Sequence, residues 1–451
     1  MAIEAGQIAQ NIALGALELG CETCELGSML DGVIADELDL EGCLPFLAIA
    51  FGKPSNTTKE SASHLLARLS DEMVGQDKPV QSSWLLDDTL VNNFDKSYFQ
   101  FLALTEDDEV TSGISTSWGD AKLKAIAEGY ERQRSADVRH DVHTTASSLS
   151  GPWLDPRVVA PLTDEQYDQL SHLQKFDENS EIEWVKGVDY KGEAVFVPID
   201  LVFYPIRGIG RKLVVNTCSS GFAAYTNVEE ATDRGVLELI ERDSLMRGWY
   251  EKRSPRKLDF QILPTHLKNR VNYWKSRGRD VFVLDISQRG VVAIQVVITS
   301  DEYPCFVSGA SSTLGGFEEA AIKAFHEAES RLIYGLNEPE TRTIEPTHVH
   351  SVLDHELLYA QSKMYHEYVQ FLFDGITSNV PPVATASIAS LKKELKAVTV
   401  DVSEGHSSLS VVKVLSPEMI PISFGYGADH YTHHTLTRAV SGSSTVPHYF
   451  A

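Results

Sequence analysis

Three glutamates in the sequence share a spacing that could build a charged binding site. Each is preceded by an alanine at a distance of seven residues and followed by an arginine at a distance of four. The three sets are Ala121, Glu128 and Arg132, then Ala231, Glu238 and Arg242, and then Ala320, Glu327 and Arg331. Steps of seven and four keep such residues near one stripe of a helix. The pattern predicts three helices, each presenting a glutamate and an arginine to a shared space.

Two of the sets carry a second carboxylate three residues after the first, at Glu131 and Glu241, whereas the third has Ser330 there. Carboxylates that converge on one cavity repel one another and raise their own pKa values unless a cation neutralises them. Oxygen ligands of this kind suit Mg²⁺, and arginines beside them could bind phosphates through paired hydrogen bonds. The alternative is three amphipathic helices whose Glu–Arg pairs each contribute only about 0.2–0.5 kcal/mol.

Known nucleotide motifs are absent from the sequence. It contains no GxxxxGK[ST] and no GxGxxG that leads into a helix, so neither a P-loop nor a Rossmann site is predicted. The residues alone therefore predict a glutamate-rich site for Mg²⁺ and a nucleotide, without naming a reaction.

The elements that must position these residues are long helices at 113–135, 226–251 and 312–335. Asn227, followed three residues later by Glu230, is a capping signal for the second helix, and Asp120 could cap the first. Strands are expected in a hairpin that turns at Lys191 and Gly192, and also at 281–286, 291–299, 305–309, 397–402 and 409–415. Strands mixed with long helices, without strict βαβ alternation, indicate an α+β fold.

The chain divides into two parts by composition. Residues 1–80 are rich in alanine and leucine, with helical patterns at 5–20 and 57–73, and are interpreted as an N-terminal helical docking region. Residues 81–451 carry all three Glu–Arg sets and are interpreted as the catalytic domain. Cys21 and Cys24 form a CxxC, which is expected to provide free thiols rather than a zinc site, because a structural zinc site needs four convergent ligands.

Charge and hydropathy exclude several classes of protein. The formal net charge of −25 argues against a nucleic-acid partner, which would need a basic surface. No stretch approaches 18 uninterrupted apolar residues, and the N-terminus lacks the basic region of a signal peptide. Five scattered cysteines favour a reducing compartment. These features together predict a cytoplasmic protein without a membrane partner.

The stretch SSGFAAYTNVEEATDRGVLELIERD, which contains Glu238 and Glu241, resembles the YcaO family. It is most similar to the cyclodehydratases that form azoline heterocycles in ribosomal peptides. The resemblance covers roughly residues 85–451 and includes separate blocks at 155–170, 184–204, 353–359 and 411–425. It implies mixed β-sheets and three long helices whose glutamates and arginines surround ATP and Mg²⁺.

The resemblance also implies roles for individual residues. The metal ligands would be Glu128, Glu131, Glu238 and Glu241. The nucleotide would contact Glu128, Arg132, Ser219, Ser220, Glu238, Arg242, Glu327 and Arg331. The C-terminal tail would reach the active site, where His448 and the terminal residue Ala451 are the catalytic candidates; for His448, a solvated tail histidine is the alternative.

The implied reaction is an ATP-dependent heterocyclisation of a precursor peptide. A Cys, Ser or Thr side chain attacks the preceding carbonyl, and phosphorylation of the amide oxygen lets that oxygen leave. The resemblance implies a separate ThiF-like partner that binds the leader peptide and a flavin-dependent azoline dehydrogenase, and it allows a homodimer within the complex.

Two alternatives remain open at this point. One is a YcaO enzyme that uses sulfide to form a thioamide. The other is a non-catalytic scaffold, which is suggested by two departures from the family pattern: Ile114 stands in place of a lysine and Lys124 in place of a serine.

Overall fold

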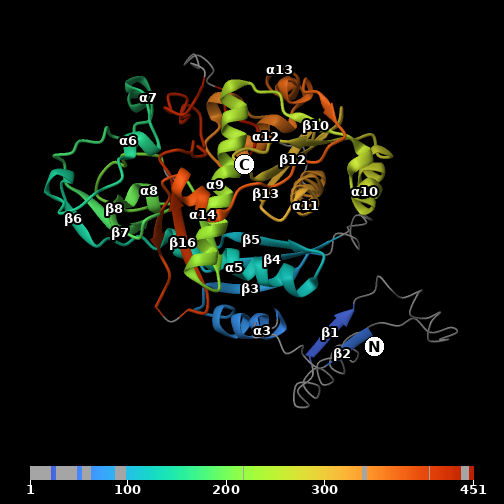
Figure 1. The fold of residues 1–451 in the computed structure, drawn as a ribbon, viewed down its shortest axis with the longest axis horizontal. Coiled ribbons are helices and arrows are strands. Elements are labelled where there is room, and N and C mark those ends of the chain that lie inside the picture. The colour runs from blue at the N-terminus through green and yellow to red at the C-terminus, as the bar shows by residue number, and fades with distance from the viewer. Residues whose placement is uncertain are drawn as a thin grey trace.

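The computed structural model describes residues 22–26, 48–52, 62–86, 98–216, 218–337, 343–405, 407–437 and 446–450. Within these ranges the chain forms several sheets whose strands alternate irregularly with helices, which confirms the predicted α+β class (Figure 1). Three helices are much longer than the others, namely α5 (Trp118–Ala136), α9 (Val228–Glu251) and α11 (Phe317–Asn337). They correspond to the three helices predicted from the Glu–Arg spacing.

Each long helix follows a strand at the edge of a different sheet. The first sheet is antiparallel and has the order β3 (Val80–Leu85), β4 (Phe99–Thr105), β5 (Val110–Ser115). The second has the order β6 (Val142–Thr144), β7 (Ile182–Asp189), β15 (Val398–Asp401), β16 (Ser410–Leu415), β9 (Phe222–Tyr225), and β8 (Ala194–Pro198) also pairs with β7. The third has the order β13 (Phe306–Thr313), β12 (Val292–Thr299), β11 (Asp280–Asp285), β10 (Arg256–Leu258), β14 (Thr377–Ser378). The repeated unit is therefore an edge strand followed by a helix: β5–α5, β9–α9 and β13–α11.

Polar side chains cap the N-termini of α5 and α9. Asn227 accepts a hydrogen bond from the Glu230 backbone N–H at 2.9 Å, as predicted. For α5 the prediction was wrong by one turn, because Ser117 is the capping residue and accepts from the Asp120 N–H. Asp120 instead lies in the first turn, where a negative charge is favourable at the positive end of the helix dipole.

In two of the units a glycine of the strand packs directly against the backbone of the helix. A Cβ atom on Gly113 of β5 would lie 2.0 Å from the Ala121 carbonyl oxygen of α5. A Cβ atom on Gly309 of β13 would lie 2.4 Å from the Ala328 backbone nitrogen of α11. Only a glycine, which has no Cβ atom, lets the strand backbone approach the helix backbone this closely. The close approach brings each helix's glutamate against its own strand.

The shorter helices and turns complete the described fold. The predicted hairpin is formed by β7 and β8, and Gly192 in its turn has a positive φ of 85°. The remaining helices are α6 (Pro156–Val159), α7 (Asp164–Gln169), α8 (Ile199–Val202), α10 (Thr265–Lys275), α12 (Val352–Ala360), α13 (Ser362–Tyr368) and α14 (Ile388–Glu394).

The first 80 residues contain strands as well as a helix. The predicted helix at 57–73 corresponds to α3 (Ala62–Met73), which packs against α5. Residues 22–26 (β1) and 48–52 (β2) pair as antiparallel strands, which the helical prediction for residues 1–80 did not include. The predicted helix at 5–20 and residue Cys21 lie outside the described residues. The docking role of this region stays a prediction.

Candidate functional site

The three Glu–Arg sets form the intrahelical pairs that their spacing predicted. Arg331 lies 2.8 Å from Glu327, Arg132 lies 3.4 Å from Glu128, and Arg242 lies 3.7 Å from both Glu238 and Glu241. The two longer separations leave guanidinium N–H groups of Arg132 and Arg242 weakly engaged. Such groups are suited to a phosphate, which accepts paired hydrogen bonds.

The first glutamate of each helix is held by the backbone of the strand before it. Glu128 accepts from the Ser112 N–H of β5 at 3.1 Å, and Glu327 accepts from the Ala310 N–H of β13 at 2.8 Å. Glu238 accepts a hydrogen bond from the Gly221 backbone, next to β9. An edge strand has N–H groups without a neighbouring strand to bind. The glutamates accept hydrogen bonds from these free strand N–H groups, and this fixes the orientation of their side chains.

The position three residues further along each helix contacts the next unit. Glu131 of α5 accepts a backbone hydrogen bond from Ala224 of β9, and Glu241 of α9 accepts one from Ser312 of β13. In α11 the corresponding residue is Ser330, whose hydroxyl accepts from Gln100 of β4 at 2.8 Å. The three units are therefore joined in a ring, and their carboxylates face a common centre. The predicted convergence is present.

Burial raises the pKa values of the second glutamates, and the neighbouring carboxylates add to the rise. Burial raises the pKa of Glu131 to about 8; Arg132 opposes this rise, and the charges of Glu238 and Glu128 add to it. Burial raises the pKa of Glu241 to about 7, opposed by Arg242 and reinforced by Glu327 and Glu238. The pKa of Glu238 is also raised by burial. At neutral pH this cluster binds protons unless another cation replaces them.

Two adjoining cavities lie over this centre. One of about 510 Å³ is bounded by β5, α5 and α11 and is lined by Glu128, Glu327 and Arg331 among others. The other, of about 420 Å³, is bounded by α9, β13 and α11, and includes Glu238 and Glu241. Glu319 and Lys323 line both, so the cavities form one cleft. Each lies within the range of about 300–1,000 Å³ that is usual for small-molecule sites.

The donor chemistry of the cleft fits Mg²⁺. Its carboxylates are hard oxygen ligands, and a divalent cation would offset the cost of burying them in ionised form. In the described part of the chain, no three His, Cys, Asp or Glu side chains already lie together as a metal-binding group. The glutamates are instead engaged by arginines and by strand N–H groups, so metal binding would require their side chains to reorient.

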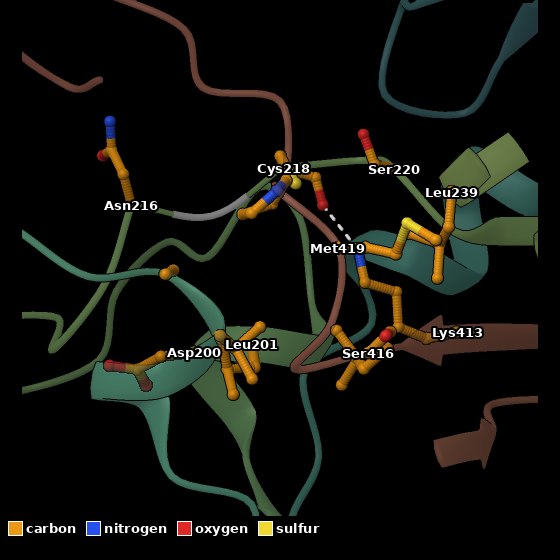
Figure 2. Close-up of a pocket in the computed structure, with 13 residues that line it drawn as sticks. Asp200, Leu201, Asn216, Cys218, Ser220, Leu239, Lys413, Ser416 and Met419 are labelled. Atoms are coloured by element: carbon orange, nitrogen blue, oxygen red, sulfur yellow. Dashed lines mark hydrogen bonds between the residues drawn. The ribbon is translucent and has the colours of Figure 1, made fainter. Parts of the chain in front are cut away.

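Lys413 of β16 is a charged residue at this centre that the sequence patterns did not single out. Its side chain is only 1% exposed, and its ammonium group donates to the Cys218 carbonyl oxygen at 2.7 Å (Figure 2). The ammonium lies 4.6 Å from the Phe222 ring centroid. Burial lowers the pKa of Lys413, whereas the nearby charges of Glu238 and Glu131 raise it. The signal in the sequence was a single lysine inside the otherwise apolar strand VVKVL.

The predicted small-residue loop lies beside Lys413. Gly221 has a φ of 83°, and a Cβ there would meet the Val414 carbonyl oxygen at 2.2 Å, so the loop lies tightly against β16. Ser219 is partly exposed, whereas Ser220 is 2% exposed and its hydroxyl has no hydrogen-bond partner among the described residues. Ser220 and Lys413 line a small cavity of about 30 Å³ (Figure 2), which has room for about one or two water molecules.

The two departures from the family pattern meet in the larger cavity. The Lys124 ammonium donates to the Ile114 carbonyl oxygen at 2.8 Å, and both residues line the cavity that contains Glu128. Burial, followed by the charge of Lys323, lowers the pKa of Lys124. Lys124 of α5 therefore places a positive charge in this wall of the cleft, where the family pattern would have a lysine at the position of Ile114 in β5.

The C-terminal tail is buried against α12 and the segment around Ser423, and none of the described tail residues 446–450 lines the cleft. His448 is 0% exposed, which excludes a solvated tail histidine, and its Nε2 lies 2.6 Å from the Ser423 carbonyl oxygen. Burial, then the charges of His355 and Arg242, hold its pKa well below the usual range, so the ring is neutral. Backbone hydrogen bonds with Ser423 and Phe450 partly oppose this lowering. Ala451 lies outside the described residues, and the catalytic role of both residues stays a prediction.

Comparison with known proteins identifies the fold. No curated protein sequence matches the chain. A solved heterocyclase in complex with substrate and cofactor matches with a TM-score of 0.67 at 16% identity, covering 81% of this chain and 53% of that one. YcaO from Methanopyrus kandleri bound with AMPPCP and Mg²⁺ matches with a TM-score of 0.59 at 18% identity, covering 80% and 91%. The E. coli microcin synthetase McbBCD complex matches with a TM-score of 0.60 at 13% identity, covering 81% and 96%.

The chain spans about half the length of the first of these heterocyclases. At such low identities the likeness establishes a shared fold. No helix among the described residues is both long and apolar enough to cross a membrane.

A sequence model of the YcaO cyclodehydratase family, described as ATP- and Mg²⁺-binding, matches residues 112–420. The matched range contains all three edge-strand–helix units, apart from the first two residues of β5. Strands β3 and β4 lie before it. It confirms the predicted family and the predicted cofactors, ATP and Mg²⁺. The chain therefore belongs to the YcaO family.

Proposed function

We propose that the chain is an ATP-dependent cyclodehydratase subunit that converts Cys, Ser or Thr residues of a ribosomal precursor peptide to thiazolines or oxazolines. The observation that carries the proposal is the convergence of glutamates of α5, α9 and α11 on one cleft, which is lined by Glu128, Glu238, Glu241 and Glu327 together with Arg331. A cluster of carboxylates of this kind suits a Mg²⁺-nucleotide.

The reaction needs an amide oxygen to leave, and phosphorylation makes it a good leaving group. The side-chain sulfur or oxygen of the peptide bonds to the preceding carbonyl carbon and loses its proton. The carbonyl oxygen takes the γ-phosphoryl group of ATP, which becomes ADP, and the C–O bond then breaks to release phosphate. The amide N–H proton is lost as the C=N bond of the azoline forms. The net change in the peptide is loss of one water.

The glutamates and the arginines would have different roles in this reaction. Glu128, Glu131, Glu238 and Glu241 would hold Mg²⁺, which neutralises phosphate charge when bound. The arginines of the three sets would orient the phosphates, since phosphoryl transfer depends mainly on positioning and electrostatic stabilisation. Ser219 and Ser220 would contact the nucleotide from their loop. For proton removal, His448 offers an imidazole that its lowered pKa keeps neutral, and Ala451 is the second candidate.

The proposed partners follow from the solved relatives. One matched structure is the McbBCD complex, and another is that complex with pro-MccB17 bound. These support a precursor peptide and further subunits for this chain. We propose a ThiF-like leader-binding protein and a flavin-dependent dehydrogenase as the subunits, with a homodimer and a cytoplasmic location remaining predictions.

The decisive experiment combines nucleotide binding with mass spectrometry of the peptide. Wild-type protein with its partner, cognate precursor and Mg-ATP should produce peptide lighter by one water per ring. Glu238→Gln should reduce turnover by about 100-fold or more, because it removes a carboxylate from the site of phosphoryl transfer. Glu229→Gln, at an exposed position in the first turn of the same helix, is the matched control and should retain activity.

Other outcomes separate the alternatives. Exchange of oxygen for sulfur in the peptide, without loss of water, would identify a thioamide-forming enzyme. Calorimetry that detects no Mg-ATP binding by wild type with its partner would favour the scaffold.

A further inference from the structure

A third cavity adjoins the cleft at the C-terminal end of α11, where Arg331 lines both spaces. It has a volume of about 230 Å³ and is enclosed by the start of β13, the end of α11, helix α12 and the C-terminal tail. We call it the aromatic pocket, because Phe306, Tyr334 and Tyr449 form much of its wall. Its volume is below the range of about 300–1,000 Å³ that is usual for small-molecule ligands. A pocket of this size fits a single side chain.

Arg331 joins the aromatic pocket to the cleft. Its guanidinium lines both cavities, and it lies 2.8 Å from Glu327 on one side and 2.8 Å from Glu356 on the other. The two spaces therefore share Arg331 as a common wall residue. A peptide with its reacting amide in the cleft would thus have the aromatic pocket as its neighbouring space.

The floor of the pocket is rigid, whereas its rim is apolar and open to solvent. Tyr449 is 4% exposed, and its hydroxyl donates to Gln295 at 3.1 Å, which fixes the ring. Phe306 is only 2% exposed. At the rim, by contrast, Tyr334 of α11 is 52% exposed and Leu353 of α12 is 44% exposed. Two large apolar side chains from separate helices, exposed at one opening, are what a site for an apolar group requires.

The polar groups of the pocket do not favour a nucleotide. Its charged side chains are Arg331 and Glu356, which pair with one another, and Ser308 is the remaining polar aliphatic group. The Glu356 carboxylate at this position would repel a phosphate. An apolar side chain, in contrast, needs no hydrogen bonds and gains free energy from burial.

From this arrangement we infer that the aromatic pocket receives one bulky apolar side chain of the precursor peptide, close in sequence to the residue that is cyclised. The inference rests on the proposed function, because it takes the neighbouring cleft as the reaction site. It makes the pocket a specificity site: peptides with Phe or Leu at the matching position would be selected over those with Ala or an acidic residue.

The test uses capped hexapeptides that contain one cysteine and otherwise alanine and glycine. A single phenylalanine is moved through the positions around the cysteine, and the all-alanine peptide is the reference. Binding is measured by saturation-transfer NMR with Mg-AMPPCP present, so that no turnover occurs. At one phenylalanine position the affinity should exceed the reference by about 10- to 100-fold, as expected for burial of one large apolar side chain.

Leu353→Trp is designed to fill the mouth of the pocket. Because Leu353 is at the exposed rim, a larger side chain can be accommodated there without repacking the core. This variant should lose most of the preference for phenylalanine. Ile376→Trp is the matched control: Ile376 is 75% exposed and does not line the pocket, so the preference should persist. If Leu353→Trp proves unfolded by circular dichroism, Leu353→Asp provides the same test by making the rim acidic.

Two results would overturn the inference: equal affinities for all peptides, or a preference for phenylalanine that survives both Leu353 variants. Calorimetry of Mg-AMPPCP with the same proteins keeps the two proposals apart. Wild-type protein that prefers the phenylalanine peptide but binds no nucleotide would refute the proposed function and leave the aromatic pocket as a peptide-binding site.

Discussion

Replacing Lys413 by methionine tests whether a buried ammonium group supports the carboxylate centre. The substitution keeps the length of the side chain and removes its charge. Two contributions are lost: the hydrogen bond to the Cys218 carbonyl, 2.7 Å in length, and the attraction that lowers the pKa of Glu238. A hydrogen bond to a charged group contributes about 1.5–3 kcal/mol, part of which is returned because the ammonium no longer has to be desolvated. We expect a net loss of stability of about 1 kcal/mol.

The effect on nucleotide binding should be larger. Without Lys413, Glu238 becomes harder to ionise, and a metal site requires ionised ligands. A rise of one pKa unit corresponds to about 1.4 kcal/mol, or a tenfold change. At pH 7 the Mg²⁺ concentration for half-maximal ATP binding should therefore increase about tenfold. At higher pH, where the carboxylates ionise in either protein, the difference should shrink.

Lys257→Met is the matched control for this prediction. The Lys257 ammonium also donates to a backbone carbonyl, that of Phe373 at 2.9 Å, but from β10 in a different part of the fold. Chemical denaturation should show a similar loss of stability in both variants, whereas calorimetry should show weakened Mg-ATP binding only for Lys413→Met. Equal nucleotide affinities for wild type and Lys413→Met at pH 7 would refute the reasoning.

Two further predictions concern packing and pH. Gly309→Ala should destabilise the protein by about 2–4 kcal/mol and weaken Mg-ATP binding, because the new Cβ would lie 2.4 Å from the Ala328 nitrogen and displace α11. Gly248→Ala in α9 is the control, because no atom outside the neighbouring helix backbone lies within 4 Å of the new Cβ. This variant should stabilise the protein by about 0.5–1 kcal/mol in urea denaturation. Destabilisation by both variants would contradict this account. His355 has a pKa lowered to about 4 by burial, so the unfolded chain takes up a proton first as the pH falls. Its stabilising contribution is present above about pH 6.5 and is lost toward pH 4, so wild type should lose about 1.4 kcal/mol more than His355→Gln between pH 7 and 5.5; equal losses would rule this out.

The helices and the chemistry of their exposed stripes could be predicted from the sequence. The pairs between Glu128 and Arg132, and between Glu327 and Arg331, depend on residues four apart in one helix, so their geometry follows from the helix itself. The Asn227 cap and the turn at Gly192 are equally local. Local interactions of this kind leave periodic or positional patterns, which is why the elements and the family were accessible before the fold was known.

The meeting of the three helices depends on contacts between residues far apart in the sequence. Glu131 is oriented by a strand more than 90 positions away, at Ala224, and Ser330 closes the ring through Gln100. Which strands lie at sheet edges, with N–H groups for the glutamates to bind, is decided by the pairing of whole sheets. No spacing rule encodes this.

Dependence on long-range contacts also explains why the sequence patterns missed some residues of the site. Lys413 looked like a single charge within a strand, and its role became visible only when β16 lay against the loop of Cys218, 195 positions earlier. The aromatic pocket needs β13, α11, α12 and the tail together, and each contributes residues that are ordinary in their own segment. The sequence determined the helical stripes that carry the charges, whereas long-range packing decided where those stripes meet, which buried charge balances them, and where a peptide side chain can enter.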